Sequence, residues 1–187
     1  MLQYLKFPDN ITLIYGPPAS GKTTLVLQIL LNTKGKIVFI DTENCFNTER
    51  LKQIKEDVNL DNIILLKAKR YSEQFAAVKS LKEMKNISLV IIDSFTKYHR
   101  RKIQENINIR PATIKMFIML RELKIPVILT SQVYSDMNNK FHPIAEHLFK
   151  NFSKYTIKLD NNKQRILTIE NTNVKIPFII TNEGLIE

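Results

Sequence analysis

Short apolar runs alternate with longer amphipathic segments along most of this chain. The apolar runs cover residues 10–15, 36–41, 62–66, 87–93 and 125–132. Between them lie segments of helical length with a polar face, at residues 22–35, 47–59, 72–85 and 110–124. Strands that are apolar on both faces and separated by such helices are typical of a parallel sheet covered by helices on both sides. The pattern therefore predicts an α/β fold, and we expect one domain spanning residues 1–187.

The pattern changes after residue 153. The stretches KYTIKLD (154–160), QRILTIE (164–170) and VKIPFII (174–180) are typical of short strands joined by tight polar turns, with no helix between them. Strands joined by tight turns pair in the antiparallel direction. We therefore expect an antiparallel C-terminal extension at an edge of the parallel sheet.

The first strand-to-helix junction carries the most specific motif of the chain. The letters GPPASGKT at 16–23 have the spacing G-x-x-x-x-G-K-T, between a predicted strand and a predicted helix. In such a loop, backbone N–H groups surround phosphates, the lysine reaches the terminal phosphates and the threonine hydroxyl helps to hold Mg²⁺. The start of the following helix adds its positive dipole. We predict that a nucleoside triphosphate binds Gly16, Pro17, Pro18, Ala19, Ser20, Gly21, Lys22, Thr23 and Thr24.

Two predicted strands end in an aspartate that could hold the Mg²⁺ of the triphosphate. Asp93 ends the apolar run 87–93, and Asp41 ends the run 36–41. Two further strands are predicted between Lys22 and Asp93. This separation is typical of ATPases with this loop, whereas kinases tend to carry the metal acid on the strand beside the loop strand. We interpret Asp93 as the metal-side acid, with Asp41 as the competing candidate and a turn-capping role for Asp93 as the ordinary alternative.

Two more polar residues stand at strand ends. Glu43 lies just beyond the strand that ends at Asp41, where a carboxylate could orient the water that attacks a γ-phosphate. Gln132 follows the strand VILTS, where its amide could contact the same phosphate. By spacing alone, both are equally well explained as ordinary polar strand ends.

Charge points toward an anionic partner. Lys and Arg number 28 against 18 Asp and Glu, so the formal net charge is +10. This surplus suits nucleic acid, and a solvated basic surface explains it equally well. The long segment 94–109 combines four cations with two rings, namely Lys97, Arg100, Arg101 and Lys102 with Tyr98 and His99. Cations that contact phosphates and rings that stack on bases are the combination that binds single-stranded nucleic acid, so this segment is a candidate for DNA contact. On composition alone, a solvated turn explains the run equally well.

Several classes of protein are not indicated. No apolar run reaches the roughly 20 residues of a membrane-spanning helix, and the first ten residues do not resemble a signal peptide. We therefore expect a cytoplasmic protein without membrane contact. Cys45 is the only cysteine, which excludes an intrachain disulfide and favours a packed thiol. His99, His142 and His147 lack the spacing of a compact metal site, so no zinc is expected.

Four motifs, in this order, resemble the RecA and RadA recombinase family, most closely its short archaeal paralogues (RadB). They are GPPASGKTT (16–24), FIDTENCFNTERL (39–51), LVIIDSFTKYHR (89–100) and LTSQVYSD (129–136). The resemblance implies a RecA-like P-loop ATPase core that uses ATP and Mg²⁺, hydrolyses ATP slowly, binds DNA and assists homologous recombination and repair. It allows recombination proteins as partners and leaves the oligomeric state open.

The resemblance also implies roles for single residues. Lys22 and Thr23 would bind phosphate and Mg²⁺, and Asp93 would be the metal-side acid. Glu43 would activate water, so that Glu43 and Lys22 form the catalytic pair. Gln132 would sense the γ-phosphate.

Other positions match the family's pattern less directly. Arg50 falls where the family packs an arginine against adenine, and residues 95–109 and 133–144 fall where its two DNA-facing loops belong. Asn44 replaces a glycine that usually follows the glutamate. Asparagine tolerates positive φ better than most residues, so the turn can persist.

Two other functions stay open on the sequence alone. One is a nucleotide-gated module with only protein clients, as in KaiC-type relatives of this fold. The other is a small-molecule kinase, but no arginine cluster follows a lid-like pair of helices. Salt-dependent DNA binding would separate the first alternative from a recombinase paralogue.

Overall fold

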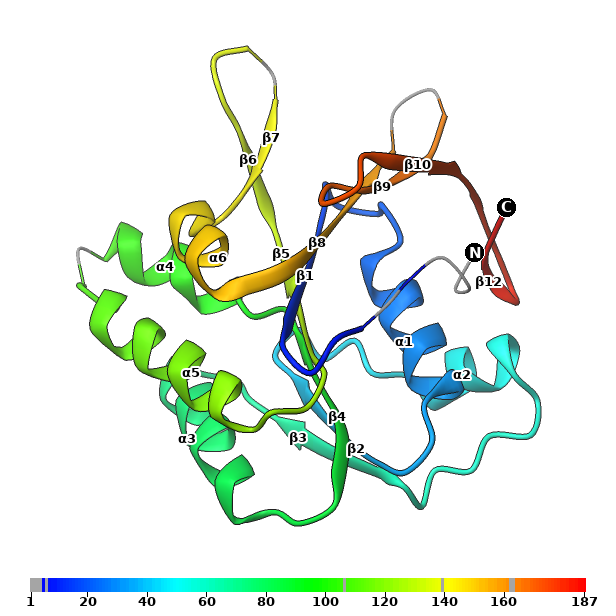
Figure 1. The fold of residues 1–187 in the computed structure, drawn as a ribbon, viewed down its shortest axis with the longest axis horizontal. Helices are drawn as coiled ribbons and strands as arrows, with labels where there is room; N and C mark the ends of the chain where they lie inside the picture. Colours follow the sequence, from blue (N-terminus) through cyan, green and yellow to red (C-terminus); the bar gives the residue numbers. More distant parts are fainter. Residues whose placement is uncertain (1–4, 6, 106, 139, 162–163) are drawn as a thin grey trace.

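An eight-stranded sheet forms the centre of the computed structural model (Figure 1). The structure describes residues 5, 7–105, 107–138, 140–161 and 164–187, but not the side chains of Arg100, Ile103 and Gln104. Across the sheet the order is β10-β9-β8-β1-β5-β4-β2-β3. The strands are β1 (Ile11–Tyr15), β2 (Lys36–Asp41), β3 (Ile63–Lys67), β4 (Ile87–Asp93), β5 (Val127–Ser131), β8 (Ser153–Asp160), β9 (Ile166–Ile169) and β10 (Val174–Pro177). The order places β1 between β8 and β5, near the middle of the sheet.

Six neighbouring strands, from β8 to β3, run parallel, and β9 and β10 continue the sheet in the antiparallel direction. The predicted parallel sheet with an antiparallel C-terminal extension is therefore confirmed. The extension begins one strand later than expected, because β8 pairs in parallel with β1. Helix α6 (Glu146–Phe152) precedes β8 and returns the chain to the opposite end of the sheet, as a parallel pairing requires.

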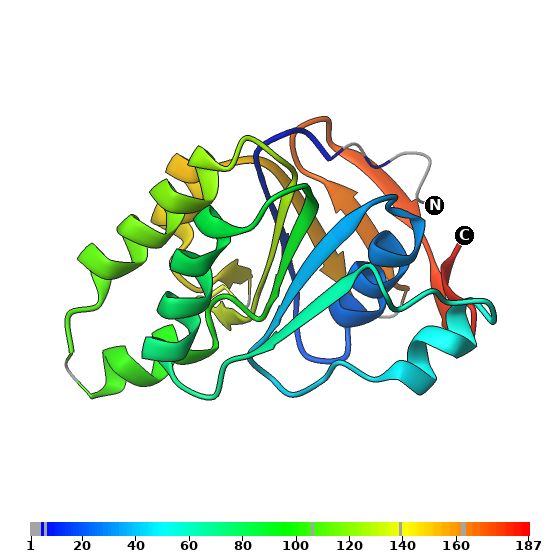
Figure 2. The ribbon, with the colours of Figure 1, turned by 90° about the horizontal axis from the view of Figure 1, so that it is seen from below.

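Helices cover both faces of the sheet (Figure 2). They are α1 (Lys22–Asn32), α2 (Thr48–Ile54), α3 (Tyr71–Ser80), α4 (Lys97–Gln104), α5 (Arg110–Glu122), α6 and the 3₁₀ turn η2 (Leu81–Glu83). Alternate side chains of β1 serve the two faces. Ile14 packs with α1 and α2, whereas Leu13 and Tyr15 pack with α3, α5 and α6. This is the period-2 alternation of a strand buried on both sides.

The two long connections contain regular structure of their own. Within 94–109 the helix α4 forms, and β6 (Val133–Ser135) and β7 (Phe141–Pro143) form a hairpin within 133–144. Phe95, Tyr98 and His99 are buried at the i, i+3, i+4 spacing of one helix face. That spacing explains why a mostly polar segment becomes helical.

A second small hairpin, β11 (Ile179–Thr181) and β12 (Gly184–Ile186), closes the chain against α1. The Gln28 amide holds it, because Nε2 donates to the Leu185 carbonyl at 3.2 Å and Oε1 accepts from the Leu185 N–H at 2.8 Å. Gly184 has φ +110°, and a side chain there would collide with Gln28. Among the described residues, none of the helices combines the length and apolar character needed to cross a membrane.

Candidate nucleotide-binding site

The loop between β1 and α1 borders a cavity of about 550 Å³ at the carboxyl ends of the parallel strands. In open α/β sheets this edge is where ligands bind. The cavity brings together most of the predicted site residues, namely Gly16, Pro18, Ala19, Ser20, Gly21, Lys22, Thr23, Thr24, Glu43, Asp93 and Gln132. Of the predicted nucleotide residues, Pro17 and Arg50 do not line it.

Both glycines of the loop are required by its shape. Gly21 has φ +99°, and a Cβ there would lie 3.1 Å from the Ile180 Cδ1 atom. At Gly16 a Cβ would collide with the Leu159 carbonyl oxygen on β8. Glycine therefore supplies backbone freedom at one position and close approach to β8 at the other.

Lys22 is folded back over the loop. Its Nζ donates to the carbonyls of Gly16 and Pro17, each at 2.8 Å. Burial lowers the pKa of Lys22, while Asp93 and Glu43 favour its charged form. Because its partners among the described residues are carbonyl oxygens, the ammonium group can exchange them for phosphate oxygens without breaking an ion pair.

Asp93 lies opposite Thr23, although their elements are far apart in sequence. The Thr23 hydroxyl donates to Asp93 Oδ2 at 2.8 Å, and the Thr130 hydroxyl from β5 donates to Oδ1. Strand β5 lies between β1 and β4, as expected when the metal acid is not on the strand beside the loop strand. A hydroxyl and a carboxylate oxygen are the kind of ligands that Mg²⁺ takes.

Asp41 serves the next turn instead. Its carboxylate accepts backbone N–H groups from Glu43 at 3.1 Å, Cys45 at 3.2 Å and Phe46 at 3.0 Å. Asn44 in this turn has φ +57°, the left-handed conformation that we expected it to tolerate. The arrangement favours Asp93 over Asp41 as the metal-side acid, because Asp41 is occupied in shaping the loop that carries Glu43.

Glu43 and Gln132 meet at the mouth of the cavity. Gln132 Nε2 donates to Glu43 Oε1 at 2.8 Å, which joins the loop after β2 to the end of β5. The Gln132 N–H donates to the Thr96 hydroxyl at 3.2 Å, just before α4. The two polar strand ends therefore form one connected unit with the segment leading into α4.

Cys45 lies beside the two aspartates. Its Sγ is 3.4 Å from Asp93 Oδ2 and 3.6 Å from Asp41 Oδ1. Burial, followed by the two carboxylates, raises the pKa of the thiol well above its ordinary value. The thiol is therefore protonated at neutral pH and is a poor nucleophile.

The predicted DNA-contacting residues on α4 differ in whether their side chains are buried or reach the surface. Tyr98 is buried, and its hydroxyl donates to the carbonyls of Ala68 at 2.6 Å and Thr42 at 3.2 Å. The prediction that Tyr98 stacks on bases is therefore wrong, because its ring is packed in the core. His99 is buried as well, and burial lowers its pKa.

The cationic side chains of α4 differ in the partners that they contact. Lys97 Nζ donates to the Thr42 carbonyl, next to Glu43. Arg101 and Lys102 both pair with Glu105, at 2.9 Å and 2.7 Å. The side chain of Arg100 lies outside the described residues. Arg101 is exposed and Lys102 is half-buried, and solvent screening keeps surface pairs of this kind weak, so both cations can be released to a phosphate.

Arg50 on α2 contacts the C-terminal hairpin. Its NH1 donates to the Asn182 carbonyl at 3.0 Å and its NH2 to the Thr181 carbonyl at 2.7 Å. The neighbouring Ile180 lines the cavity. Arg50 thus lies beside the cavity rather than within its lining.

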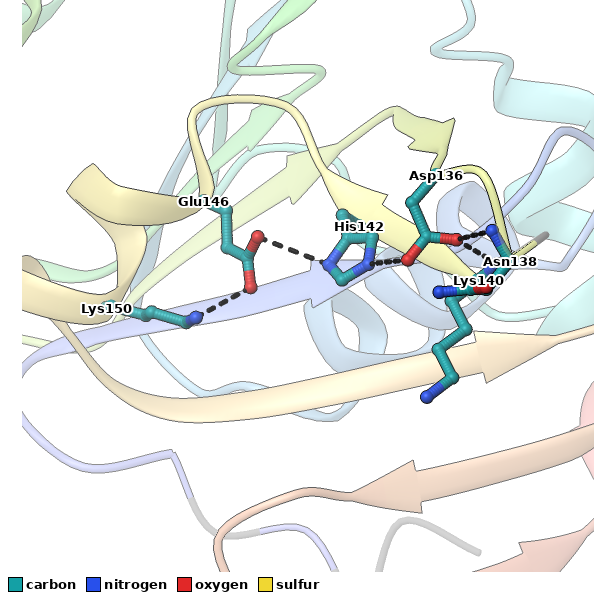
Figure 3. A network of polar contacts seen from close by, with 6 residues as sticks. All are labelled: Asp136, Asn138, Lys140, His142, Glu146 and Lys150. Atoms are coloured by element: carbon teal, nitrogen blue, oxygen red, sulfur yellow. Dashed lines mark hydrogen bonds and ion pairs between the residues drawn. The ribbon is translucent and has the colours of Figure 1, made fainter.

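His142 ties the β6–β7 hairpin to α6 (Figure 3). Its Nε2 is 3.1 Å from Asp136 Oδ2, its Nδ1 is 3.2 Å from Glu146 Oε2, and Lys150 pairs with Glu146 at 2.8 Å. Lys150, followed by His142, holds the pKa of Glu146 below its usual range. In the described part of the chain, no group of three or more His, Cys, Asp or Glu side chains is placed to hold a metal ion.

Three residues that line the cavity, Ser94, Val133 and Ile180, were not among the predicted site residues, and neither were two residues that contact the loop from beside the cavity. Asn161 and Arg165, from the connection between β8 and β9, donate to carbonyls of the phosphate loop. The sequence carried no signal for them, because they stand in an ordinary polar turn and reach the loop only through the pairing of β8 with β1.

Comparisons with known proteins place the chain in a family. Residues 10–178 match a family model described as zonular occludens toxin (Zot). The DNA repair and recombination protein RadB of Thermococcus sibiricus is 31% identical over 94% of this chain and 85% of its own length. RadB of Thermococcus onnurineus is 36% identical over 82% of this chain and 74% of its own length. A crystal structure of the RadB recombinase superposes with a TM-score of 0.78 and 31% identity, covering 100% of this chain and 95% of the other. The chain therefore belongs to the RecA/RadA recombinase family, within its RadB branch.

Proposed function

We propose that this protein binds ATP with Mg²⁺ in the cavity at the β1–α1 loop, hydrolyses it slowly, and contacts DNA to assist homologous recombination and repair. The observation that carries the proposal is the 2.8 Å hydrogen bond between Thr23 and Asp93. It joins the start of α1 to the end of β4 and gathers two oxygen ligands beside the phosphate loop. The relatives' shared name, DNA repair and recombination protein, supports the biological role.

In this proposal each residue of the cavity acts on the triphosphate. Lys22 and the N–H groups at the start of α1 neutralise and hold the phosphates. Thr23 and Asp93 would hold Mg²⁺, which balances charge on the phosphate oxygens. Glu43 orients the attacking water, and Gln132 binds the γ-phosphate. Because Gln132 already contacts Glu43 at 2.8 Å, binding of the γ-phosphate by Gln132 would change the environment of the water-orienting acid.

DNA contact is assigned to the cations of α4, now without a stacking role for Tyr98. Arg101 is exposed, Lys102 is half-buried, and their shared partner Glu105 is a weak competitor for a phosphate diester. The formal net charge of +10 supports a polyanionic partner. Lys97 connects this helix to the Thr42 carbonyl beside Glu43, so DNA bound at α4 lies one contact away from the ATP site.

ATP hydrolysis measured with and without single-stranded DNA tests the proposal. We expect weak Mg²⁺-dependent turnover that single-stranded DNA increases, and DNA affinity that falls with salt. Absence of Mg²⁺-dependent ATP binding by the folded protein would refute the nucleotide site. ATP binding without any DNA binding at low salt would instead favour a nucleotide-gated module with protein clients only.

A further inference from the structure

Four consecutive carbonyls of the phosphate loop each accept a hydrogen bond from a side chain. Lys22 Nζ takes the first two, those of Gly16 and Pro17. Asn161 Nδ2 donates to the Pro18 carbonyl at 2.9 Å, and Arg165 NH1 donates to the Ala19 carbonyl at 2.8 Å. The loop is therefore held from inside by its own lysine and from outside by the connection between β8 and β9.

Asn161 and Arg165, the outer anchors, flank strands β8 and β9, and β8 lies directly against the loop. The Leu159 carbonyl on β8 approaches Gly16 so closely that no side chain fits between them. Tyr15, the residue before the loop, donates from its hydroxyl to Glu170, which follows the far end of β9, at 2.5 Å. Strands β8 and β9, which Asn161 and Arg165 flank, are thus tied to the loop strand by backbone pairing and by this side-chain bond.

The identity of the loop residues explains why such anchors matter. Pro17 and Pro18 have no N–H, so the first residue after Gly16 that can offer an amide to a phosphate is Ala19. In a trans peptide the carbonyl and the following N–H point in opposite directions. A donor on the Pro18 carbonyl therefore sets the direction of the Ala19 N–H. Ala19 itself has φ +57°, an uncommon conformation for alanine that surrounding contacts must maintain.

We propose that Asn161 and Arg165 are positioning residues for nucleotide binding, which hold the Pro18–Ala19 segment in its phosphate-binding conformation before the ligand arrives. The inference rests on the proposed ATP site. Preorganisation of this kind strengthens binding because the ordering cost is met in the free protein. Since the anchors act equally on bound substrate and transition state, their loss raises KM and leaves kcat nearly unchanged.

Separate Asn161→Ala and Arg165→Ala variants test this, with Lys175→Ala as the control. Lys175 is an exposed cation on β10, so its removal changes the charge of the same edge without touching the loop. Titration with a fluorescent ATP analogue in Mg²⁺ gives Kd, steady-state hydrolysis gives KM and kcat, and thermal melting without nucleotide reports the fold. Each anchor variant should raise Kd and KM about tenfold. This is the effect expected when one hydrogen bond is lost, neutral in the Asn161 variant and charge-assisted in the Arg165 variant.

The Asn161 variant excludes simple charge attraction, because it changes no charge and its effect should persist at high salt. Arg165→Lys, which keeps a donor of similar reach, should recover part of the lost affinity. An unchanged Kd in both alanine variants, with ATP bound normally by the unaltered protein, would overturn the inference. A lowered melting temperature with unchanged Kd would overturn it too, since the connection would then serve the fold alone. If the unaltered protein itself fails to bind ATP, the proposed function falls instead.

Discussion

Lys22→Ala is the substitution that most directly separates ATP binding from folding. Lys22 is the one cation among the described residues that line the cavity, and its Nζ holds the carbonyls of Gly16 and Pro17 at 2.8 Å. It is also the first residue of α1, where alanine is favourable for the helix. The change therefore removes a half-buried charge from the ligand site while leaving the backbone of the helix suited to its position.

The expected effect on stability is small because opposing contributions cancel. Two hydrogen bonds from a charged donor contribute about 1.5–3 kcal/mol each. Against them stand the desolvation that lowers the pKa of Lys22 and about 2 kcal/mol of lysine rotamer entropy. We expect the free energy of unfolding to change by about 1–2 kcal/mol, or roughly 2–8 °C in melting temperature for a chain of this length.

The expected effect on ATP binding is much larger. Contacts from the ammonium group to the β- and γ-phosphates are charge-assisted, and losing two of them removes about 3–6 kcal/mol. That corresponds to a loss in affinity of about 10²- to 10⁴-fold. Isothermal titration calorimetry with ATP and Mg²⁺, together with thermal melting, measures both quantities on the same sample. Lys34→Ala is the matched control, because Lys34 is exposed just beyond the other end of α1.

A folded Lys22→Ala variant that binds ATP as tightly as the unaltered protein would refute this reasoning, since no other cation lines the described cavity. Equal losses of ATP affinity in the Lys34 control would also refute it, because a general effect of net charge would then explain both results.

Three further predictions concern chemistry, DNA and pH. Glu43→Gln keeps an oxygen that can accept from the Gln132 amide, so ATP affinity should persist. The variant loses the acid that orients water, so kcat should fall about 10²-fold or more, and equal turnover in a steady-state assay would place the water-orienting role elsewhere. Arg100→Ala combined with Arg101→Ala should flatten the dependence of log Kd for single-stranded DNA on log salt by about one unit, and an unchanged slope would move the DNA site away from α4. Burial and then Glu170 raise the pKa of Tyr15, so its neutral form stabilises the fold below the ordinary tyrosine value of 10.0, and this contribution is lost as pH rises above it. Tyr15→Phe should therefore flatten the alkaline loss of stability by up to about 1.4 kcal/mol per pH unit in denaturant titrations, and identical slopes would contradict the assignment.

The parts of the fold that could be predicted are those in which local pattern and burial agree. The strands Lys36–Asp41 and Ile87–Asp93 match their predicted bounds, because runs that are apolar on both faces require a central position in a sheet. Helix α2 ends at Ile54, well before residue 59, since only Leu51 in it is buried and little holds the remaining polar turn. Helix α4 was not predicted, because most of its residues are charged or polar and only Tyr98 and His99 mark its buried face in the sequence.

The candidate site was predictable where one motif carries its own geometry. The spacing from Gly16 to Thr23 is specific to a phosphate-binding loop between a strand and a helix, and the end of β4 directs Asp93 to the same sheet edge. Contacts between distant segments were not predictable in this way. Asn161 and Arg165 lie beside the loop only because β8 pairs in parallel with β1. The residues of a polar turn do not indicate which strands pair beside it.

The central position of β1 has a consequence for how the chain is made. Ile11 pairs with Val127 on one side and with Ser153 on the other, so β1 is synthesised long before either neighbour. Contacts between such distant segments are slow to form, because a long stretch of chain must be closed first. During synthesis on the ribosome, β1 stays an unpaired apolar segment until β5 and then β8 emerge. An unpaired apolar segment of this kind is prone to aggregation. The phosphate loop is therefore among the first segments translated and among the last to reach its working shape, so a nascent chain that ends before β8 should not yet bind nucleotide.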